Sequence, residues 1–99
     1  MTVDEIRNTL IEALVENQSL SGYAVPRISD DTRPIGDLEG FDSLNATELS
    51  VMLSESLRRE VPMKVMLAPV NGESPKVRDI VARLYELVEP KGGQGNEPD

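Results

Sequence analysis

Apolar residues recur every three or four positions in the first part of the chain, between Thr2 and Glu16. The apolar positions are Val3, Ile6, Leu10, Leu14 and Val15, with charged residues between them. This spacing is typical of an amphipathic helix. Thr2 and Glu5 have the three-residue separation of a capping box, which predicts where the helix starts. We expect it to stop in the stretch from Asn17 to Gly22.

A long connection follows, from Ser21 to Gly40. Helical periodicity disappears there, and turn-forming residues recur: Pro26, Asp30, Asp31, Pro34, Gly36 and Gly40. A connection of about 20 residues is unusual in a compact domain, so it either carries a function or hides an unrecognised element. We expect four apolar side chains to hold it against the core: Val25, Ile28, Ile35 and Leu38.

Two further amphipathic helices are predicted. The second helix opens at Asp42-Ser43 and runs to about Arg59, with Pro62 ending it. Its apolar stripe is Leu44, Leu49, Met52, Leu53 and Leu57, and its other faces carry Asn45, Glu48, Ser54, Glu55 and Arg58. The last helix takes Ser74 as N-cap and Pro75 as its first residue, and stops at Pro90. Its inward positions are Val77, Ile80, Val81, Leu84, Leu87 and Val88.

The remaining segments are short or polar. Residues 63–70 lie between two prolines, and either a helical turn or an extended piece fits there. Asn71-Gly72 predicts a tight turn. The Gly-rich tail from Lys91 to Asp99 has nothing to bury, so we expect disorder. The predicted fold is therefore an all-α bundle of three main helices plus a short third element, one domain over residues 1–89 with a tail at 90–99.

Composition narrows the function. A chain of 99 residues builds one core. It has no Cys and no His, which excludes disulfides, thiolate nucleophiles, Cys/His zinc sites and Ser-His or Cys-His catalysis. A base active near neutral pH would have to be a strongly shifted carboxylate or lysine in a dry pocket, which so small a chain can hardly build. We therefore expect a protein that is not an enzyme.

Charge and hydropathy bear on partners and location. The chain has 18 acidic and 10 basic residues, a formal charge of -8. Nucleic-acid binding depends on Lys and Arg, so this balance argues against it and favours basic protein partners. No apolar run approaches the roughly 20 residues of a membrane span, and the acidic N-terminus is unlike a signal peptide. We expect a cytoplasmic monomer without membrane insertion.

Ser43 is the candidate for chemistry. It follows the long connection and Asp42 directly, at the start of an amphipathic helix. The first turn of a helix presents unpaired N–H groups and the positive end of its dipole, so a phosphate on Ser43 would be favoured there. The same Asp-Ser pattern is also typical of an ordinary N-cap, which would leave Ser43 without further function.

The order of these elements resembles the acyl carrier protein family, which includes peptidyl carrier domains. The likeness consists of a capped first helix, a long Pro/Gly connection, Gly40-Phe41-Asp42-Ser43-Leu44 opening the second helix, and a short amphipathic helix at the end. It spans about Val3 to Val88, and its specific part is the run 42–44. Further matching positions are Leu38, Gly40, Glu48, Leu49, Leu53, Leu57 and Pro62.

The resemblance implies a carrier function. Ser43 would receive 4'-phosphopantetheine from coenzyme A through a phosphopantetheinyl transferase, and the thiol of that arm would replace the missing cysteine. An acyl or related group would ride on the arm as a thioester and be presented to acyl-activating, synthase or acyltransferase enzymes of lipid or polyketide biosynthesis. Asp42 would help position Ser43, Leu44 would anchor the helix start, and Glu48 and Glu55 would face basic partner surfaces.

Two departures from the family limit what the resemblance implies. The second helix ends in Arg58 and Arg59 where fatty-acid carriers are acidic, so we place both with the partner-binding residues and expect an unusual partner set. The segment from Val61 to Ser74 is longer than usual, so the cargo is not implied. The alternative function is an unmodified helical interaction module of the same fold, with Ser43 only as helix N-cap.

A calcium loop is a third interpretation of the same residues. Counted from Asp37 as position 1, oxygen-bearing side chains fall at positions 3, 9 and 12: Glu39, Asn45 and Glu48. Position 5 is Phe41, however, and position 6 is Asp42, where the sharp turn needs Gly. We therefore expect no metal here.

Overall fold

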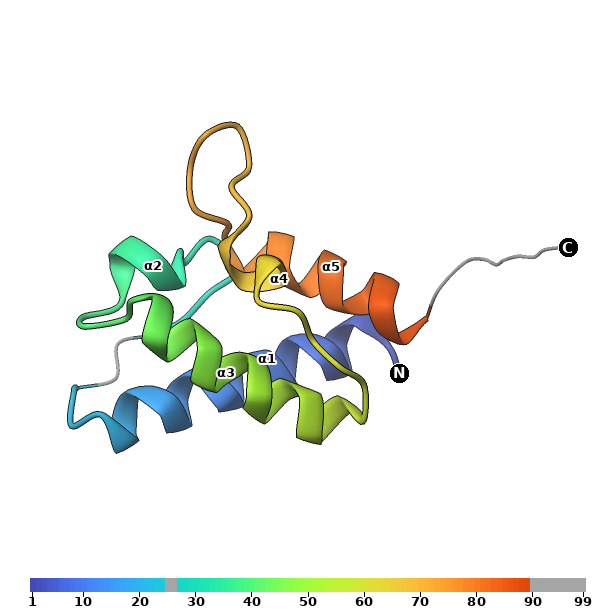
Figure 1. Ribbon diagram of the computed structural model, residues 1–99, viewed down its shortest axis with the longest axis horizontal. Coiled ribbons are helices and arrows are strands. Elements are labelled where there is room, and N and C mark those ends of the chain that lie inside the picture. The colour runs from blue at the N-terminus through green and yellow to red at the C-terminus, as the bar shows by residue number, and fades with distance from the viewer. Residues whose placement is uncertain (25–26, 90–99) are drawn as a thin grey trace, which may run out of the picture.

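The computed structural model describes residues 1–24 and 27–89. Within them the chain forms five helices and no strand: α1 (Val3–Leu20), α2 (Pro34–Asp37), α3 (Ser43–Leu57), α4 (Lys64–Leu67) and α5 (Val77–Val88) (Figure 1). The prediction of an all-α bundle with three main helices is confirmed. The expectations for Val25, Pro26 and the tail at 90–99 lie outside the described residues.

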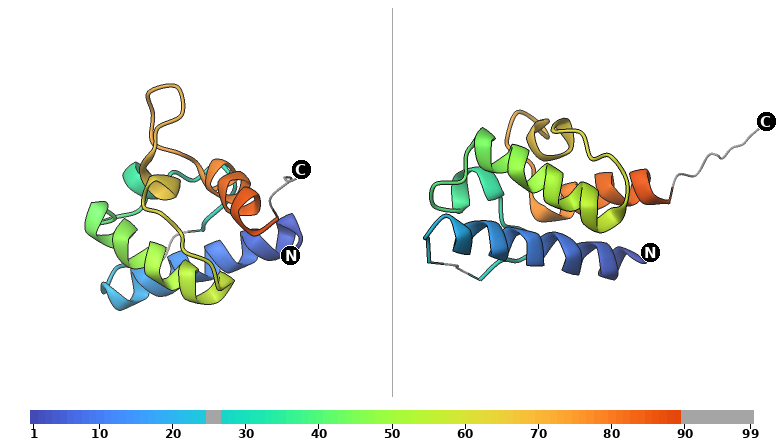
Figure 2. Two further views of the ribbon diagram at one scale, coloured as in Figure 1. Left: turned by 45° about the vertical axis from the view of Figure 1, so that its right-hand side comes forward. Right: turned by 60° about the horizontal axis from the view of Figure 1, so that its bottom comes forward.

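The three long helices enclose one aliphatic core. α1 packs against both α3 and α5, and the single turn of α4 packs on α3 and α5 (Figures 1 and 2). Each fully buried aliphatic side chain stabilises the fold by about 1.5–3 kcal/mol. The largest of these side chains are Ile6, Leu10, Leu14, Leu49, Leu53, Met66, Val77, Ile80 and Leu84.

Both ends of α1 lie where the sequence predicts them. Thr2 Oγ1 accepts a hydrogen bond from Glu5 N at 3.1 Å, and Glu5 Oε1 accepts one from Thr2 N at 2.7 Å, which completes the capping box. The helix continues past Glu16 to Leu20, because Asn17 and Gln18 are buried and extend its inner face. Its end at Leu20, with Ser21 as C-cap, lies within the stretch from Asn17 to Gly22 where the stop was predicted.

Two residues of the stripe predicted for α1 are exposed. Val3 and Val15 are exposed, whereas Ile6, Leu10 and Leu14 are buried. Successive residues turn by about 100° on a helix, so Val15 falls about 100° beyond Leu14 and outside the stripe. Val3 has the phase of the stripe but is the first residue of α1, where its side chain is exposed.

The second predicted helix corresponds to α3. It begins at Ser43 and ends at Leu57, since Arg58 adopts φ 56°, in the left-handed region, and donates its N–H to Ser54 O. Pro62 lies four residues further on, so it does not end the helix as predicted. Leu44, placed in the apolar stripe, is 65% exposed, and Asn45, placed on a polar face, is buried. Both of these placements are wrong.

The last helix, α5, begins later than predicted. Its N-cap is Lys76 rather than Ser74, and Pro75 is buried ahead of the helix. Ser74 Oγ instead donates a hydrogen bond to Ile35 O at 2.8 Å. The serine hydroxyl therefore holds the long connection rather than a helix end.

The long connection and α5 satisfy each other's backbone groups. Val77 N donates to Thr32 O at 2.8 Å and Arg78 N to Asp30 O at 3.1 Å, so the connection supplies acceptors for the first turn of α5. Leu38 is buried as predicted. Ile28 and Ile35 are half-buried against the core. The three predicted anchors that lie in the described residues are thus confirmed.

The segment between α3 and α5 contains the helical turn α4 and a tight turn. Val70 and Glu73 exchange backbone hydrogen bonds at 2.7 and 3.0 Å across Asn71 (φ 52°) and Gly72 (φ 81°). The predicted turn at Asn71-Gly72 is confirmed, and it projects from the bundle (Figures 1 and 2). Of the helices described here, none combines the length and apolarity that crossing a membrane requires.

Candidate functional site at the start of helix α3

Asp42 is the N-cap of α3. Its Oδ1 accepts hydrogen bonds from Leu44 N at 3.0 Å and Asn45 N at 3.1 Å. Ser43 is the first residue inside the helix, with helical geometry. The interpretation of Ser43 as the N-cap is therefore wrong, because its neighbour fills that role.

The Ser43 side chain is exposed at the end of the helix. Its backbone carbonyl accepts a hydrogen bond from Thr47 Oγ1 at 2.9 Å. Within residues 1–24 and 27–89, no hydrogen bond to the Ser43 hydroxyl is formed, by contrast with the Ser54 and Ser74 hydroxyls, which both bond backbone groups. A reagent could approach this hydroxyl without breaking a contact in the described fold.

A buried polar cluster holds the backbone just before Ser43. The Asn45 amide lies between the end of α1 and the loop, with Nδ2 3.0 Å from Asn17 Oδ1 and 3.3 Å from Ser21 Oγ. With the amide turned over, its nitrogen faces Gly40 O at 3.0 Å and Asp42 Oδ1 at 2.8 Å. In either orientation Asn45 ties the first turn of α3 to its surroundings.

The loop before Asp42 is fixed at two more points. Gln18, fully buried, donates from Nε2 to Glu39 O at 3.0 Å. Gly40 has φ 71°, a conformation that favours glycine, and a Cβ added there would run into the ring of Tyr23. Phe41 follows with its side chain in the core. The position of Ser43 is thus determined from both sides of the chain.

The first turn of α3 differs from the prediction in one electrostatic respect. Asp42 Oδ1 takes the amides of Leu44 and Asn45, so these two N–H groups are not available to a phosphate on Ser43. The positive end of the helix dipole remains favourable for an anion at this position. A phosphate here would project from the helix end rather than sit in a cradle of amides.

One face of α3 is exposed and combines apolar and acidic residues. Leu44 and Val51 are 65% and 56% exposed and lie two turns apart, so they point the same way. Glu48 and Glu55 are exposed on the same side, at positions i+4 and i+11 from Leu44. This surface, Leu44, Glu48, Val51 and Glu55, is called the α3 face below.

Met63 extends the exposed apolar surface beyond α3. Its Sδ lies 3.2 Å from Thr47 Oγ1, and its side chain is 37% exposed. Since Thr47 also contacts the Ser43 carbonyl, the exposed methionine lies one helical turn from Ser43. Leu44 therefore does not anchor the helix start as expected; it contributes to an exposed surface beside the serine.

Arg58 and Arg59 lie at the opposite end of α3 from Ser43. Both are exposed, and Arg58 occupies the left-handed C-cap position. They would complement the negative end of the helix dipole there. The structure therefore separates the two basic residues from the serine by the full length of α3.

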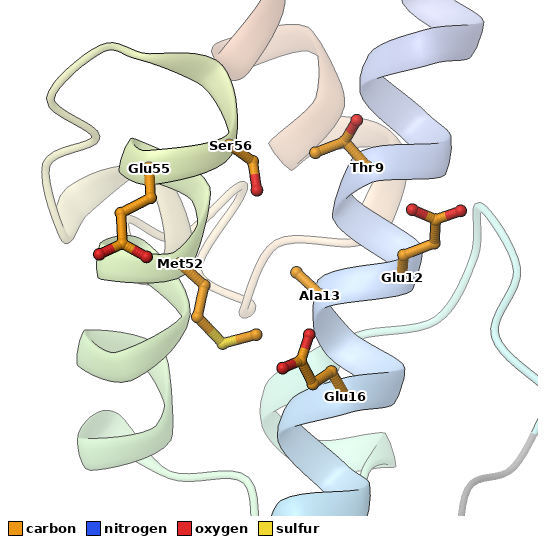
Figure 3. Close-up of a pocket in the computed structure, with 7 residues that line it drawn as sticks. All are labelled: Thr9, Glu12, Ala13, Glu16, Met52, Glu55 and Ser56. Atoms are coloured by element: carbon orange, nitrogen blue, oxygen red, sulfur yellow. The ribbon is translucent and has the colours of Figure 1, made fainter.

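An acidic groove of about 210 Å³ separates α1 from α3 (Figure 3). Glu12 and Glu16 of α1 and Glu55 of α3 line it, and Ala13 and Met52 contribute its apolar part. Across the described part of the chain, none of these three carboxylates lies in an ion pair. Glu55 thus belongs both to this groove and to the edge of the α3 face.

The residues considered as a calcium loop do not direct their oxygen atoms at a common point. Asp42 Oδ1 is directed at helix amides, Phe41 is buried, and Glu48 Oε1 accepts from Asn17 Nδ2 at 3.3 Å. In residues 1–24 and 27–89 there is no cluster of three or more acidic, His or Cys side chains that could hold a metal ion.

Asn17, Gln18 and Asn45 are the site residues that the sequence analysis missed. Polar type alone suggested a helix stop for the first two and a solvated face for the third. Their positions carried the relevant information, because residue 17 continues the spacing of Ile6, Leu10 and Leu14, and residue 45 lies four residues before Leu49. Polar residues in phase with an apolar stripe indicate a buried hydrogen-bonded cluster.

Comparisons with models of known protein families, with curated proteins and with solved structures give no match.

Proposed function

We propose that the chain is a carrier protein that holds an acyl or related group as a thioester on 4'-phosphopantetheine attached to Ser43. The observation that carries this proposal is the division of roles at the start of α3. Asp42 caps the helix, while the Ser43 hydroxyl is exposed and has no partner among the described residues. A serine with no part in capping, on a firmly held helix start, suits a covalent attachment.

The attachment reaction needs little from the chain itself. Ser43 Oγ would attack the phosphorus that joins pantetheine to the rest of coenzyme A, and the bond from that phosphorus to 3',5'-ADP would break. The hydroxyl proton would pass to a base of the transferase. The arm would then supply the thiol that a chain without cysteine lacks. The contribution of the chain is to hold Ser43 in a fixed, accessible place through Asp42, Asn45 and Gly40.

The residues around Ser43 are compatible with such an arm. The hydroxyl is exposed at the positive end of a helix of 15 residues, which favours a phosphodiester. The Asp42 carboxylate, which would repel a phosphate, is directed at the amides of Leu44 and Asn45. A phosphate attached to Ser43 would thus project from the N-terminal end of α3, away from the Asp42 carboxylate.

The α3 face suits the enzymes that would use the cargo. Exposed Leu44 and Val51 offer apolar contact beside Ser43, and Glu48 and Glu55 offer charge to basic patches. In this proposal the protein works in the cytoplasm as a monomer and catalyses nothing itself. Its partners are the transferase and the enzymes that load and unload the thioester.

Intact-mass measurement after incubation with coenzyme A and a broad-specificity phosphopantetheinyl transferase tests the proposal. We expect the wild type to gain one phosphopantetheine and Ser43→Ala to gain none. Ser56→Ala, which removes another exposed serine of the same helix, is the matched control and should be modified like the wild type. A wild type that gains no mass would refute the carrier function and leave the unmodified interaction module.

A further inference from the structure

A further surface feature lies where α4 packs against α5. It is a groove of about 350 Å³ between α4 and the second half of α5. Its walls are mainly hydrocarbon, and no aromatic ring or hydroxyl lines it. The lining residues are Pro62, Lys64, Val65, Ala68, Arg83, Glu86 and Leu87. The Ser43 site contributes none of them.

Two cations lie at this groove without a carboxylate partner. Arg83 Nη1 donates to Val65 O at 3.0 Å and to Lys64 O at 3.4 Å, so the guanidinium is held against the carbonyls of the first two residues of α4. In the described residues, neither Arg83 nor Lys64 forms an ion pair. Glu86 is the one acid among the lining residues, which leaves the groove with a net positive charge. The other N–H groups of Arg83 therefore remain free to bind an anion.

Four basic residues elsewhere in the described fold do have acid partners. Arg7 pairs with Asp4 and Asp30 at 2.5 and 2.9 Å. A pocket beneath the Asn71-Gly72 turn also holds three cations, but each has an acid within reach: Arg33 with Glu73, and Lys76 and Arg78 with Asp31. The groove between α1 and α3 is acidic. Among these three hollows, the α4–α5 groove alone joins apolar walls to unpaired positive charge.

We propose that the α4–α5 groove binds a medium-chain aliphatic carboxylate. Val65, Ala68 and Leu87 would contact the hydrocarbon chain, and Arg83 and Lys64 would bind the carboxylate. The volume is at the lower end of the range for small-molecule sites, about 300–1,000 Å³, which suits a medium rather than a long chain. An acyl group held as a thioester has no carboxylate at its attached end, so this site is separate from the arm proposed on Ser43.

Titration of the unmodified protein with hexanoate, octanoate and decanoate below their micelle concentrations, followed by amide NMR, tests the proposal. We expect shift changes centred on residues 62–68 and 83–87. Affinity should rise about fourfold for each added methylene until the groove is full. Octyltrimethylammonium, with the same chain and the opposite charge, should bind at least tenfold more weakly than octanoate. Equal binding of the two ions, or shifts centred elsewhere, would overturn the proposal.

Variants separate the two parts of the site. Arg83→Gln should weaken octanoate binding about tenfold and leave octanol binding unchanged. Lys64→Gln keeps the backbone carbonyls that Arg83 bonds, and it should weaken octanoate binding to a smaller degree. Leu87→Gln should weaken both ligands. Arg59→Gln, which removes an exposed cation outside the groove, is the matched control. Ser43→Ala should bind octanoate like the wild type. The groove proposal can therefore fail while the proposal of attachment at Ser43 stands, and the reverse also holds.

Discussion

Replacing Asp42 with Ala tests the division of roles at the start of α3. The substitution removes the acceptor for Leu44 N and Asn45 N and the negative charge at the helix N-terminus. Loss of an N-cap costs about 1 kcal/mol, and loss of the favourable charge adds about 0.3–1 kcal/mol. We therefore expect the free energy of unfolding to fall by about 1.5 kcal/mol.

Urea denaturation followed by circular dichroism measures this change. The midpoint should fall while the m-value stays constant, because the amount of surface exposed on unfolding is unchanged. In thermal denaturation the same loss corresponds to a decrease in Tm of about 6–12 °C for a domain of this size. Asp42→Asn keeps a capping oxygen, so it should lose only about 0.5 kcal/mol.

Ser43→Ala is the decisive comparison. Because Ser43 is exposed and does not cap the helix, its replacement should change the free energy of unfolding by less than about 0.5 kcal/mol. If Ser43→Ala costs as much as Asp42→Ala, the serine does contribute to capping. Its hydroxyl would then not be free for modification.

Three further substitutions test the surroundings of the site by the same denaturation assay. Asn45→Ala should cost about 2 kcal/mol because it leaves buried partners unpaired, and Asn8→Ala, on the exposed side of α1, should be almost neutral; similar costs would rule out the buried cluster. Leu49→Ala should cost about 3 kcal/mol and Leu44→Ala less than about 0.5 kcal/mol, and the reverse order would mean that the stripe of α3 is misplaced. Gly40→Ala should cost about 2 kcal/mol or more, from backbone strain at φ 71° and the collision with Tyr23, and a neutral result would contradict that geometry.

The main helices were predictable because their cores follow the helical period over many residues. Ile6, Leu10 and Leu14 in α1 and Ile80, Val81 and Leu84 in α5 lie where the spacing puts them. Helix ends were harder to predict, because the decisive contacts come from distant segments. The first amides of α5 find acceptors in the connection 45–48 residues earlier, so Ser74 was not needed as its cap.

Leu44 shows why hydrophobicity alone misplaced one residue. It precedes Leu49 by five positions, which turns it about 140° from that buried side chain on a helix. It precedes Val51 by seven positions, which brings those two to the same face. A leucine grouped by type with the core therefore belongs, by phase, to the exposed surface beside Ser43.

The contacts that fix the backbone around Ser43 come from its neighbours and not from its own side chain. This arrangement suits an attachment point better than a serine needed for folding. Asp42, Asn45 and Gly40 fix the backbone through a cap, a buried amide cluster and a left-handed turn, and each substitution there should be costly. Ser43 lies among them, yet its side chain is exposed and free of hydrogen bonds within the described fold. If Ser43→Ala is silent in denaturation and Asp42→Ala is not, this serine adds nothing to folding. The mass measurement with coenzyme A then tests directly whether its hydroxyl is the attachment point.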